Sequence, residues 1–167
     1  MNTYKNYIWA LLITGGLIAL GVVLFLLDKP ITQQGQAFPI QGAEHIQIGA
    51  EHPAYTTNPP TSGWHYGQSA AWGVYQEALP DEQLIHNLEH GGIWISYKDI
   101  TPDIKSKLET LAQKYPGSVI LTPRTQNNTP ITLASWGRLQ ELSYYDEAII
   151  ITFIRANKNK SPEPLAQ

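Results

Sequence analysis

The segment IHNLEHGGIW, residues 85–94, holds the side chains whose types and spacing are best suited to chemistry. His86, Glu89 and His90 follow the pattern His-x-x-Glu-His, and two glycines come next. On a helix, residues four apart lie on one face one turn apart, so two imidazoles at this spacing can bind one metal ion. In the inverted zinc-peptidase motif, the glutamate acts as a general base on metal-bound water. The segment therefore predicts a pair of metal ligands, and a metal-dependent hydrolase is one reading of it.

The other ligands must come from loops, because the remaining histidines lie in segments rich in proline, glycine and hydroxyl residues. In NPPTSGWHYG, residues 58–67, two prolines and a Thr-Ser-Gly turn form a rigid loop that presents His65. His52 stands between Glu51 and a proline, and His45, nearest the N-terminus, is expected on the surface. We predict as metal ligands His86, His90 and His65, then His52, with Glu89, Glu51 and Tyr66 orienting them.

The distribution of charge supports a bound cation. From Pro30 to Tyr97 there is no Lys or Arg, but this stretch holds all five histidines and six acids. From Lys98 onward there are nine Lys or Arg, seven acids and no histidine, a split that the net charge of -3 conceals. A segment with imidazoles and carboxylates but no fixed cations suits a metal ion, although a solvated acidic face would look the same.

The absence of cysteine narrows the choice of metal. Without it the chain cannot form thiolate-ligated zinc, iron–sulfur, c-type haem or blue copper sites, and its single methionine is Met1. A zinc or copper ion held by imidazole and carboxylate remains as the cofactor, with zinc as the default. We expect three histidine ligands and one exchangeable position, where Glu89 either orients an imidazole or acts as a base on bound water.

Two alternatives to a simple metal-binding domain remain open. The histidines can instead form a buried network, bonded to Glu51, Glu89 and the backbone, that holds a loop-rich region together. The chain would then be a non-catalytic interaction module whose partner contacts an aromatic surface. The second alternative is the metal-dependent hydrolase, with Glu89 as its catalytic residue. The aromatic surface would consist of Trp64, Tyr66, Trp72 and Tyr75.

The elements that must position these residues follow from the hydrophobic pattern. A short helix is expected from Asp81, as N-cap, to His90, and the segments 92–98, 118–122 and 131–136 read as strands, the last running on past Gly137. Thr101 and Asp146 begin two further helices. The pattern predicts an α+β fold with a small, largely antiparallel sheet, helices on one face and long ordered loops in the N-terminal half.

An apolar run precedes this domain. Ile8 to Leu27 is 20 residues without a charge, enough to cross a hydrocarbon core of about 30 Å at about 1.5 Å per residue. The run is longer than a signal-peptide core, and the amino group tips the positive-inside balance between Lys5 and Lys29. We expect residues 1–7 to be a cytoplasmic tail, 8–27 a transmembrane signal anchor, 28–43 a tether, 44–164 an extracytoplasmic domain and 165–167 a tail. The expected partners are the membrane and a protein, but no nucleic acid.

The order of motifs resembles a bacterial family catalogued as a domain of unknown function, number three-one-zero-five. The resemblance covers about residues 44–164 and rests on PPTSG-x-H and H-x-LEHGG, followed by a Trp-Gly strand and a final helix. It implies a single-span anchored protein, which agrees with residues 8–27, and it implies no activity or cofactor. His45 does not clearly match its pattern. The residues that do match are Glu51, His52, Pro59, Pro60, Thr61, Ser62, Gly63, His65, His86, Glu89, His90 and Gly91.

Overall fold

The computed structural model describes residues 7–8, 12–18 and 32–166, and the chain divides into two compact units, 1–32 and 33–167. In the first unit, residues 7–8 and 12–18 are helical. Most of the expected signal anchor, residues 9–11 and 19–27, lies outside the described residues, as do residues 1–6 of the expected tail and 28–31 of the expected tether. Among the residues that are described, no helix combines the length and the apolar character needed to span a membrane.

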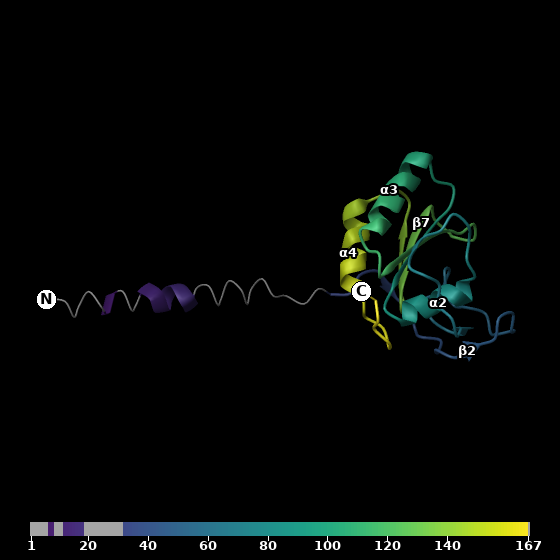
Figure 1. Ribbon diagram of the computed structural model, residues 1–167, viewed down its shortest axis with the longest axis horizontal. Helices are drawn as coiled ribbons and strands as arrows, with labels where there is room; N and C mark the ends of the chain where they lie inside the picture. Colours follow the sequence, from purple (N-terminus) through teal and green to yellow (C-terminus); the bar gives the residue numbers. More distant parts are fainter. Residues whose placement is uncertain (1–6, 9–11, 19–31, 167) are drawn as a thin grey trace. The chain divides into compact units, whose positions relative to one another are not determined.

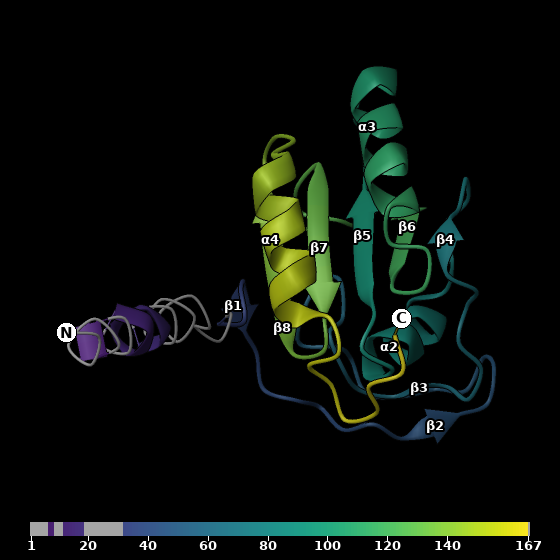
Figure 2. The same ribbon diagram turned by 60° about the vertical axis from the view of Figure 1, so that its left-hand side comes forward.

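The second unit has a mixed α/β fold built on a six-stranded sheet, with a separate two-stranded sheet beside it. The large sheet has the order β1-β8-β7-β5-β6-β4, and the small sheet pairs β2 with β3 (Figures 1 and 2). The elements are β1 (Gln36–Ala37), β2 (His45–Ile46), β3 (His65–Tyr66), β4 (Gly73–Val74), α2 (Asp81–Glu89), β5 (Ile93–Tyr97), α3 (Pro102–Gln113), β6 (Val119–Pro123), β7 (Ile131–Ser135), β8 (Arg138–Leu142) and α4 (Glu147–Asn157).

The prediction of a largely antiparallel sheet is wrong, because the sheet is mixed. β5 and β6 are parallel neighbours, and β4 also runs parallel to β6. The helix α3 lies between β5 and β6 in the chain, and a crossover helix returns the chain to the same end of the sheet, so the two strands must run in the same direction. The antiparallel pairs are β5 with β7, β7 with β8, and β8 with β1.

The helices cover both faces of the sheet, whereas the sequence predicted one. Ile93, Ile95 and Tyr97 of β5 pack in a cluster with α3 and α4, and the intervening Trp94 packs with α2 in a second cluster. Successive side chains of a strand point to opposite faces, so a strand that is apolar at every position needs cover on both sides. All five residues of β5 are buried, which places α2 and its histidines against the sheet.

The last two helices begin where the sequence predicted, at Thr101 and Asp146. The side chain of Thr101 accepts a hydrogen bond from the backbone N–H of Ile104 at the start of α3. Asp146 accepts one in the same way from Ile149 at the start of α4. The strand expected to continue past Gly137 instead reverses there, at φ +66°, and returns as β8. A positive φ strains residues with a Cβ, so glycine suits this two-residue turn.

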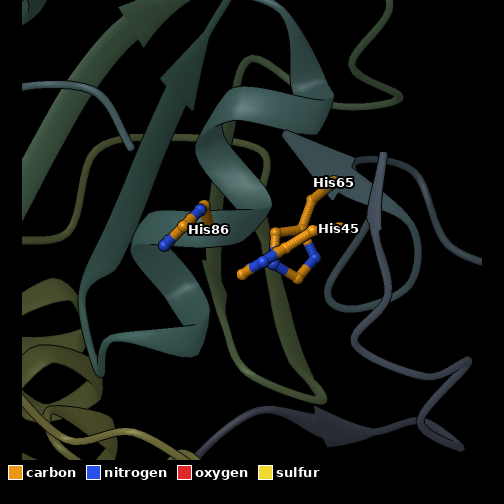
Figure 3. Close-up of side chains that lie close together, drawn as sticks. All are labelled: His45, His65 and His86. Atoms are coloured by element: carbon orange, nitrogen blue, oxygen red, sulfur yellow. The ribbon is translucent and has the colours of Figure 1, made fainter. Parts of the chain in front are cut away.

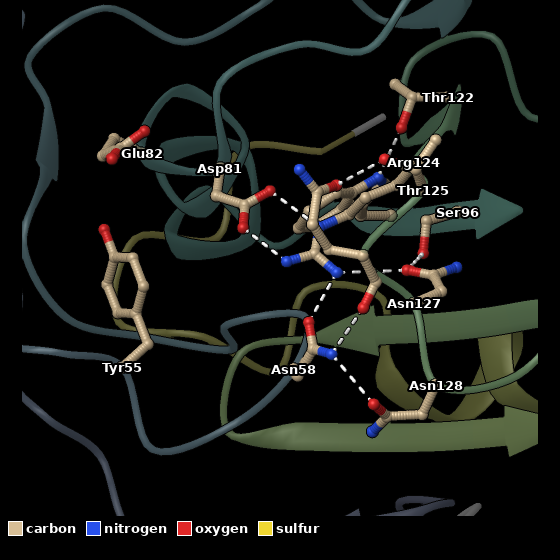
Figure 4. A network of polar contacts seen from close by, with 12 residues as sticks. Tyr55, Asn58, Asp81, Glu82, Ser96, Thr122, Arg124, Thr125, Asn127 and Asn128 are labelled. Carbon is tan, nitrogen blue, oxygen red and sulfur yellow. Dashed lines mark hydrogen bonds and ion pairs between the residues drawn. The ribbon is translucent and has the colours of Figure 1, made fainter. Parts of the chain in front are cut away.

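A buried arginine joins the PPTSG loop to the start of α2 (Figure 4). Asp81 was predicted as the N-cap of this helix, but Pro80 occupies the cap and Asp81 is the first helical residue. Its carboxylate accepts two hydrogen bonds from Arg124, at 2.9 and 2.7 Å, while Nη1 of Arg124 donates to Oδ1 of Asn58 at 2.6 Å. Because Asn58 directly precedes the two prolines, this fork holds both histidine-bearing segments in one arrangement.

Candidate metal centre

The helix α2 presents three polar side chains at its C-terminal end. His86, Glu89 and His90 follow one another at spacings that place them on neighbouring positions of the helix surface. The helix ends directly afterwards, because Gly91 has φ +84° and a Cβ there would lie 2.5 Å from Oδ1 of Asn159. The end of the helix is therefore fixed at the site, as the two glycines indicated.

The small β2–β3 sheet brings two more histidines to the same place. His45 pairs with His65 in parallel register, and their rings meet edge to face with centroids 4.8 Å apart. The ring of His45 also stacks on that of His86, at 4.9 Å between centroids. His45, predicted to be a plain surface residue, is therefore part of the histidine cluster, although 55% of its side chain is exposed.

The ligand nitrogens of His45, His65 and His86 all lie within 4.8 Å of one another (Figure 3). In a tetrahedral zinc site with Zn–N bonds of about 2.0–2.1 Å, ligand nitrogens stand about 3.4 Å apart. Small side-chain movements would therefore close the three imidazoles on one ion. His65 and His86 are only 0% and 6% exposed, so the partly exposed His45 forms the open side of the site.

Hydrogen bonds to the backbone orient the two buried imidazoles. Nδ1 of His65 lies 2.8 Å from the carbonyl oxygen of Gly63, and Nδ1 of His86 lies 2.6 Å from that of Tyr66. A carbonyl oxygen only accepts, so in each ring the proton must be on Nδ1. The second nitrogen, Nε2, faces Oε2 of Glu89 at 3.0 Å in His65 and Nε2 of His90 at 2.7 Å in His86. Metal-binding histidines show this arrangement, in which the outer nitrogen donates to a carbonyl and fixes the ring.

A buried carboxylate completes the set. Oε2 of Glu89 lies 3.0 Å from Nε2 of His65 and 3.6 Å from Nε2 of His45, and 6% of the Glu89 side chain is exposed. The lone pair of His65 and the carboxylate repel each other unless a cation lies on or between them. That cation is either a proton or a metal ion, so this contact is the point at which a metal would replace a proton.

Burial keeps His86 available as a ligand. Desolvation by burial is the largest cause of a lowered pKa for His86, and the neighbouring His90 acts in the same direction. The hydrogen bond to the carbonyl of Tyr66 opposes them by raising the pKa. A pKa below the usual value leaves the ring neutral at pH 7, with its Nε2 free of a proton.

Of the other two predicted ligands, His90 borders the histidine cluster and His52 lies outside it. Nε2 of His90 lies 2.7 Å from Nε2 of His86, so His90 borders the cluster from the helix end. Its Nδ1 has no hydrogen-bond partner and lies 3.6 Å from Oε2 of Glu163. The ring of His52 contacts the carbonyl of Pro53 at 2.9 Å and the carboxylate of Glu82 at 3.3 Å. The structure therefore does not bring His52 to the cluster.

Glu51 and the phenol of Tyr66 do not orient the histidines, and the residues expected to form an aromatic surface are partly buried. Glu51 is exposed, and Tyr66 contributes its backbone carbonyl to the site rather than its phenol. The four residues expected to form an aromatic surface are each only half exposed, and Trp64 stacks on the ring of His52 with 17° between the planes. These four are Trp64, Tyr66, Trp72 and Tyr75.

A repeated tetrapeptide is the sequence feature that could have indicated His45 as a candidate ligand. Gly-Ala-Glu-His occurs twice, at residues 42–45 and 49–52, so both histidines have the same local sequence. The structure uses the first copy: it pairs with the segment that carries His65, and the backbone N–H of His65 donates to the carbonyl of Glu44 at 3.1 Å. Only this pairing between distant segments distinguishes the two copies.

Comparison with known proteins identifies the family of the chain but no similar curated protein or solved structure. The family model described as "Protein of unknown function (DUF3105)" matches residues 46–167. No curated protein and no solved structure matches the chain. The matched segment contains His65, His86, Glu89 and His90, and it begins one residue after His45.

Proposed function

Because the chain belongs to the DUF3105 family, whose description assigns no activity, we propose from its own side chains that it binds one transition-metal ion, zinc by default. The ligands in this proposal are His45, His65 and His86, with the carboxylate of Glu89 beside them. Three imidazoles and one carboxylate without sulfur suit zinc or Cu(II).

One observation carries the proposal: His45, His65 and His86 place ligand nitrogens within 4.8 Å of one another, and Nε2 of the buried His65 lies 3.0 Å from a buried carboxylate. A purely structural network would place a donor opposite each acceptor, because an unmatched buried polar pair costs free energy. At the contact of His65 Nε2 with Glu89 Oε2, a proton on the imidazole or a bound metal ion supplies this match, and metal binding would replace the proton.

The position of Glu89 favours a role in orienting the imidazoles and balancing the charge of the ion over that of a general base. A base must reach the water that it activates, but Oε2 of Glu89 is already 3.0 Å from His65 and 3.6 Å from His45. The proposal therefore concerns metal binding and assigns no turnover.

Metal uptake is the direct test. The purified full chain in mild detergent, stripped with a chelator and then dialysed against zinc, should retain about one ion per chain, measured by elemental analysis. Zinc at 100 times Kd should stabilise the protein by about 2.7 kcal/mol, since a ligand bound only by the native state shifts the unfolding equilibrium. The corresponding rise in melting temperature is roughly 5–10 °C. A melt unchanged by zinc, Cu(II), Ni(II) and Co(II) would favour the metal-free histidine network.

We further propose that residues 8–27 anchor the chain in a bacterial cell membrane and that the domain from Gln33 onward lies on the extracytoplasmic side. The support is the uncharged 20-residue run and the amino group, which tips the positive-inside balance between Lys5 and Lys29. Alkaline phosphatase, which is active only after export, should be active when fused after Gln167. The same fusion without residues 8–27 should be inactive. Activity of a cytoplasm-only reporter at that position would reverse the orientation.

A further inference from the structure

An open cavity of about 580 Å³ lies between the β2–β3 sheet and the N-terminal half of α2. Its volume is within the range of small-molecule sites, about 300–1,000 Å³. The lining consists of apolar and amide side chains and carries no charged group. Among the lining residues are Ile46, Ile48, Tyr66, Gly67, Gln68 and Gln83.

The cavity adjoins the proposed metal centre at Gly67. A Cβ at this residue would lie 4.0 Å from Nδ1 of His45. Because glycine has no side chain, the cavity is open toward that imidazole at this position. Ile46 directly follows His45 in β2, and Gln83 stands one turn before His86 on α2. A ligand in the cavity would therefore have one end about one helical turn, or about 5 Å, from the histidine cluster.

The open side of the centre faces solvent at His45. His65, His86 and Glu89 are buried, and His45 alone of the proposed ligands has a largely exposed side chain, at 55%. A coordination position left free by the protein would be on this side. A ligand atom that takes this position can thus belong to a molecule whose remainder occupies the cavity.

The charge of the surroundings selects among such molecules. No Lys or Arg lines the cavity, so an anionic ligand would find no fixed cation among the lining side chains. The isoleucines and Tyr66 offer apolar contact, while the glutamines offer neutral hydrogen bonds. We propose that the cavity binds a neutral organic ligand with one metal-coordinating atom and one apolar group. This inference rests on the proposed metal centre.

Two small probes test the inference: imidazole, and 4-phenylimidazole, which carries the same coordinating nitrogen and an apolar ring. The full chain in mild detergent is loaded with Co(II), and the visible absorption bands report ligand exchange at the metal. We expect 4-phenylimidazole to bind at least about tenfold more tightly than imidazole, because its ring leaves water for the cavity. Benzoate, with the same ring and a negative charge, should bind more weakly than 4-phenylimidazole.

Matched variants locate the effect. Gly67→Leu should abolish the preference for 4-phenylimidazole and leave imidazole binding in place, because the new side chain fills the passage beside His45. Ala50→Leu adds the same side chain at an exposed position outside the cavity lining and should keep the preference. Ile48→Gln, at a residue 81% exposed and thus safe for folding, should reduce the preference several-fold.

The outcomes separate the two proposals. If Co(II) does not bind, both the metal centre and the cavity inference fail. If Co(II) binds but the two imidazoles have equal Kd values, the inference alone is overturned. A preference that survives both Gly67→Leu and Ile48→Gln, or a tighter Kd for benzoate than for 4-phenylimidazole, would also overturn it.

Discussion

His86→Ala is expected to weaken zinc binding by more than about 100-fold, the upper range for loss of a residue that only orients a ligand, whereas His52→Ala should leave the affinity unchanged. The imidazole of His86 stacks on that of His45 with centroids 4.9 Å apart, and its Nδ1 donates to the carbonyl of Tyr66. Both ring nitrogens of His52 instead contact groups outside the cluster, the carbonyl of Pro53 and the carboxylate of Glu82. Competition with a chromophoric chelator measures both affinities.

His45→Ala and His90→Ala complete the comparison. His45 is expected to behave as a ligand and to lower zinc affinity when replaced, since its ligand nitrogen lies within 4.8 Å of those of His65 and His86. His90→Ala should have a smaller effect, because His90 contacts the cluster only through His86, at 2.7 Å. Far-UV circular dichroism shows whether each variant is folded. Equal loss of zinc in the His52 and His86 variants would contradict this ligand set.

The helical part of the site could be predicted from sequence because its information is local. His86, Glu89 and His90 lie within five residues, and the glycines that follow end the helix where the pattern indicated. His65 could also be predicted from the sequence, because the prolines and the Thr-Ser-Gly turn before it indicate a rigid loop. Each of these inferences depends on chain geometry over fewer than about ten residues, a distance over which turn and helix rules apply.

The choice between His45 and His52 could not be made in this way. The two copies of Gly-Ala-Glu-His are identical, and what separates them is the pairing of β2 with β3, across about twenty residues of loop. Local propensity carries no information about such a pairing, because its free energy comes from contacts with the distant segment. His52, predicted as a fourth ligand, has the same local sequence as His45, but its ring contacts Glu82.

The error in the sheet has a different cause. The hydrophobic pattern predicts the strands and helices largely as observed, but which strands become neighbours depends on contacts between distant segments. β5 and β6 are neighbours joined by the crossover helix α3 and therefore run parallel. The continuous burial of β5 was also a signal, since a strand that is apolar at every position needs cover on both faces. Placing α2 on the second face of the sheet is what brings its histidines to the loop that carries His65.

Glu89→Gln should have opposite effects on the metal-free and metal-bound protein. In the metal-free chain, the carboxylate of Glu89 lies 3.0 Å from Nε2 of His65, whose Nδ1 donates to the carbonyl of Gly63. A glutamine amide can donate N–H to Nε2, so a contact that needs a shared proton or metal ion becomes a neutral hydrogen bond. The free energy of unfolding of the metal-free variant should therefore rise by about 1 kcal/mol.

The same substitution should lower zinc affinity by about 10–100-fold, since the buried negative charge beside His65 and His45 is lost. Urea unfolding of the chelator-treated protein gives the first quantity, and chelator competition gives the second. Glu163→Gln is the matched control, because this carboxylate is 60% exposed and contacts only His90; it should change both quantities little. A metal-free Glu89→Gln variant less stable than the unsubstituted chain would mean that a proton holds His65 and Glu89 together as an ion pair. The contact would then be a structural salt bridge, and the argument from this contact to a metal ion would fail.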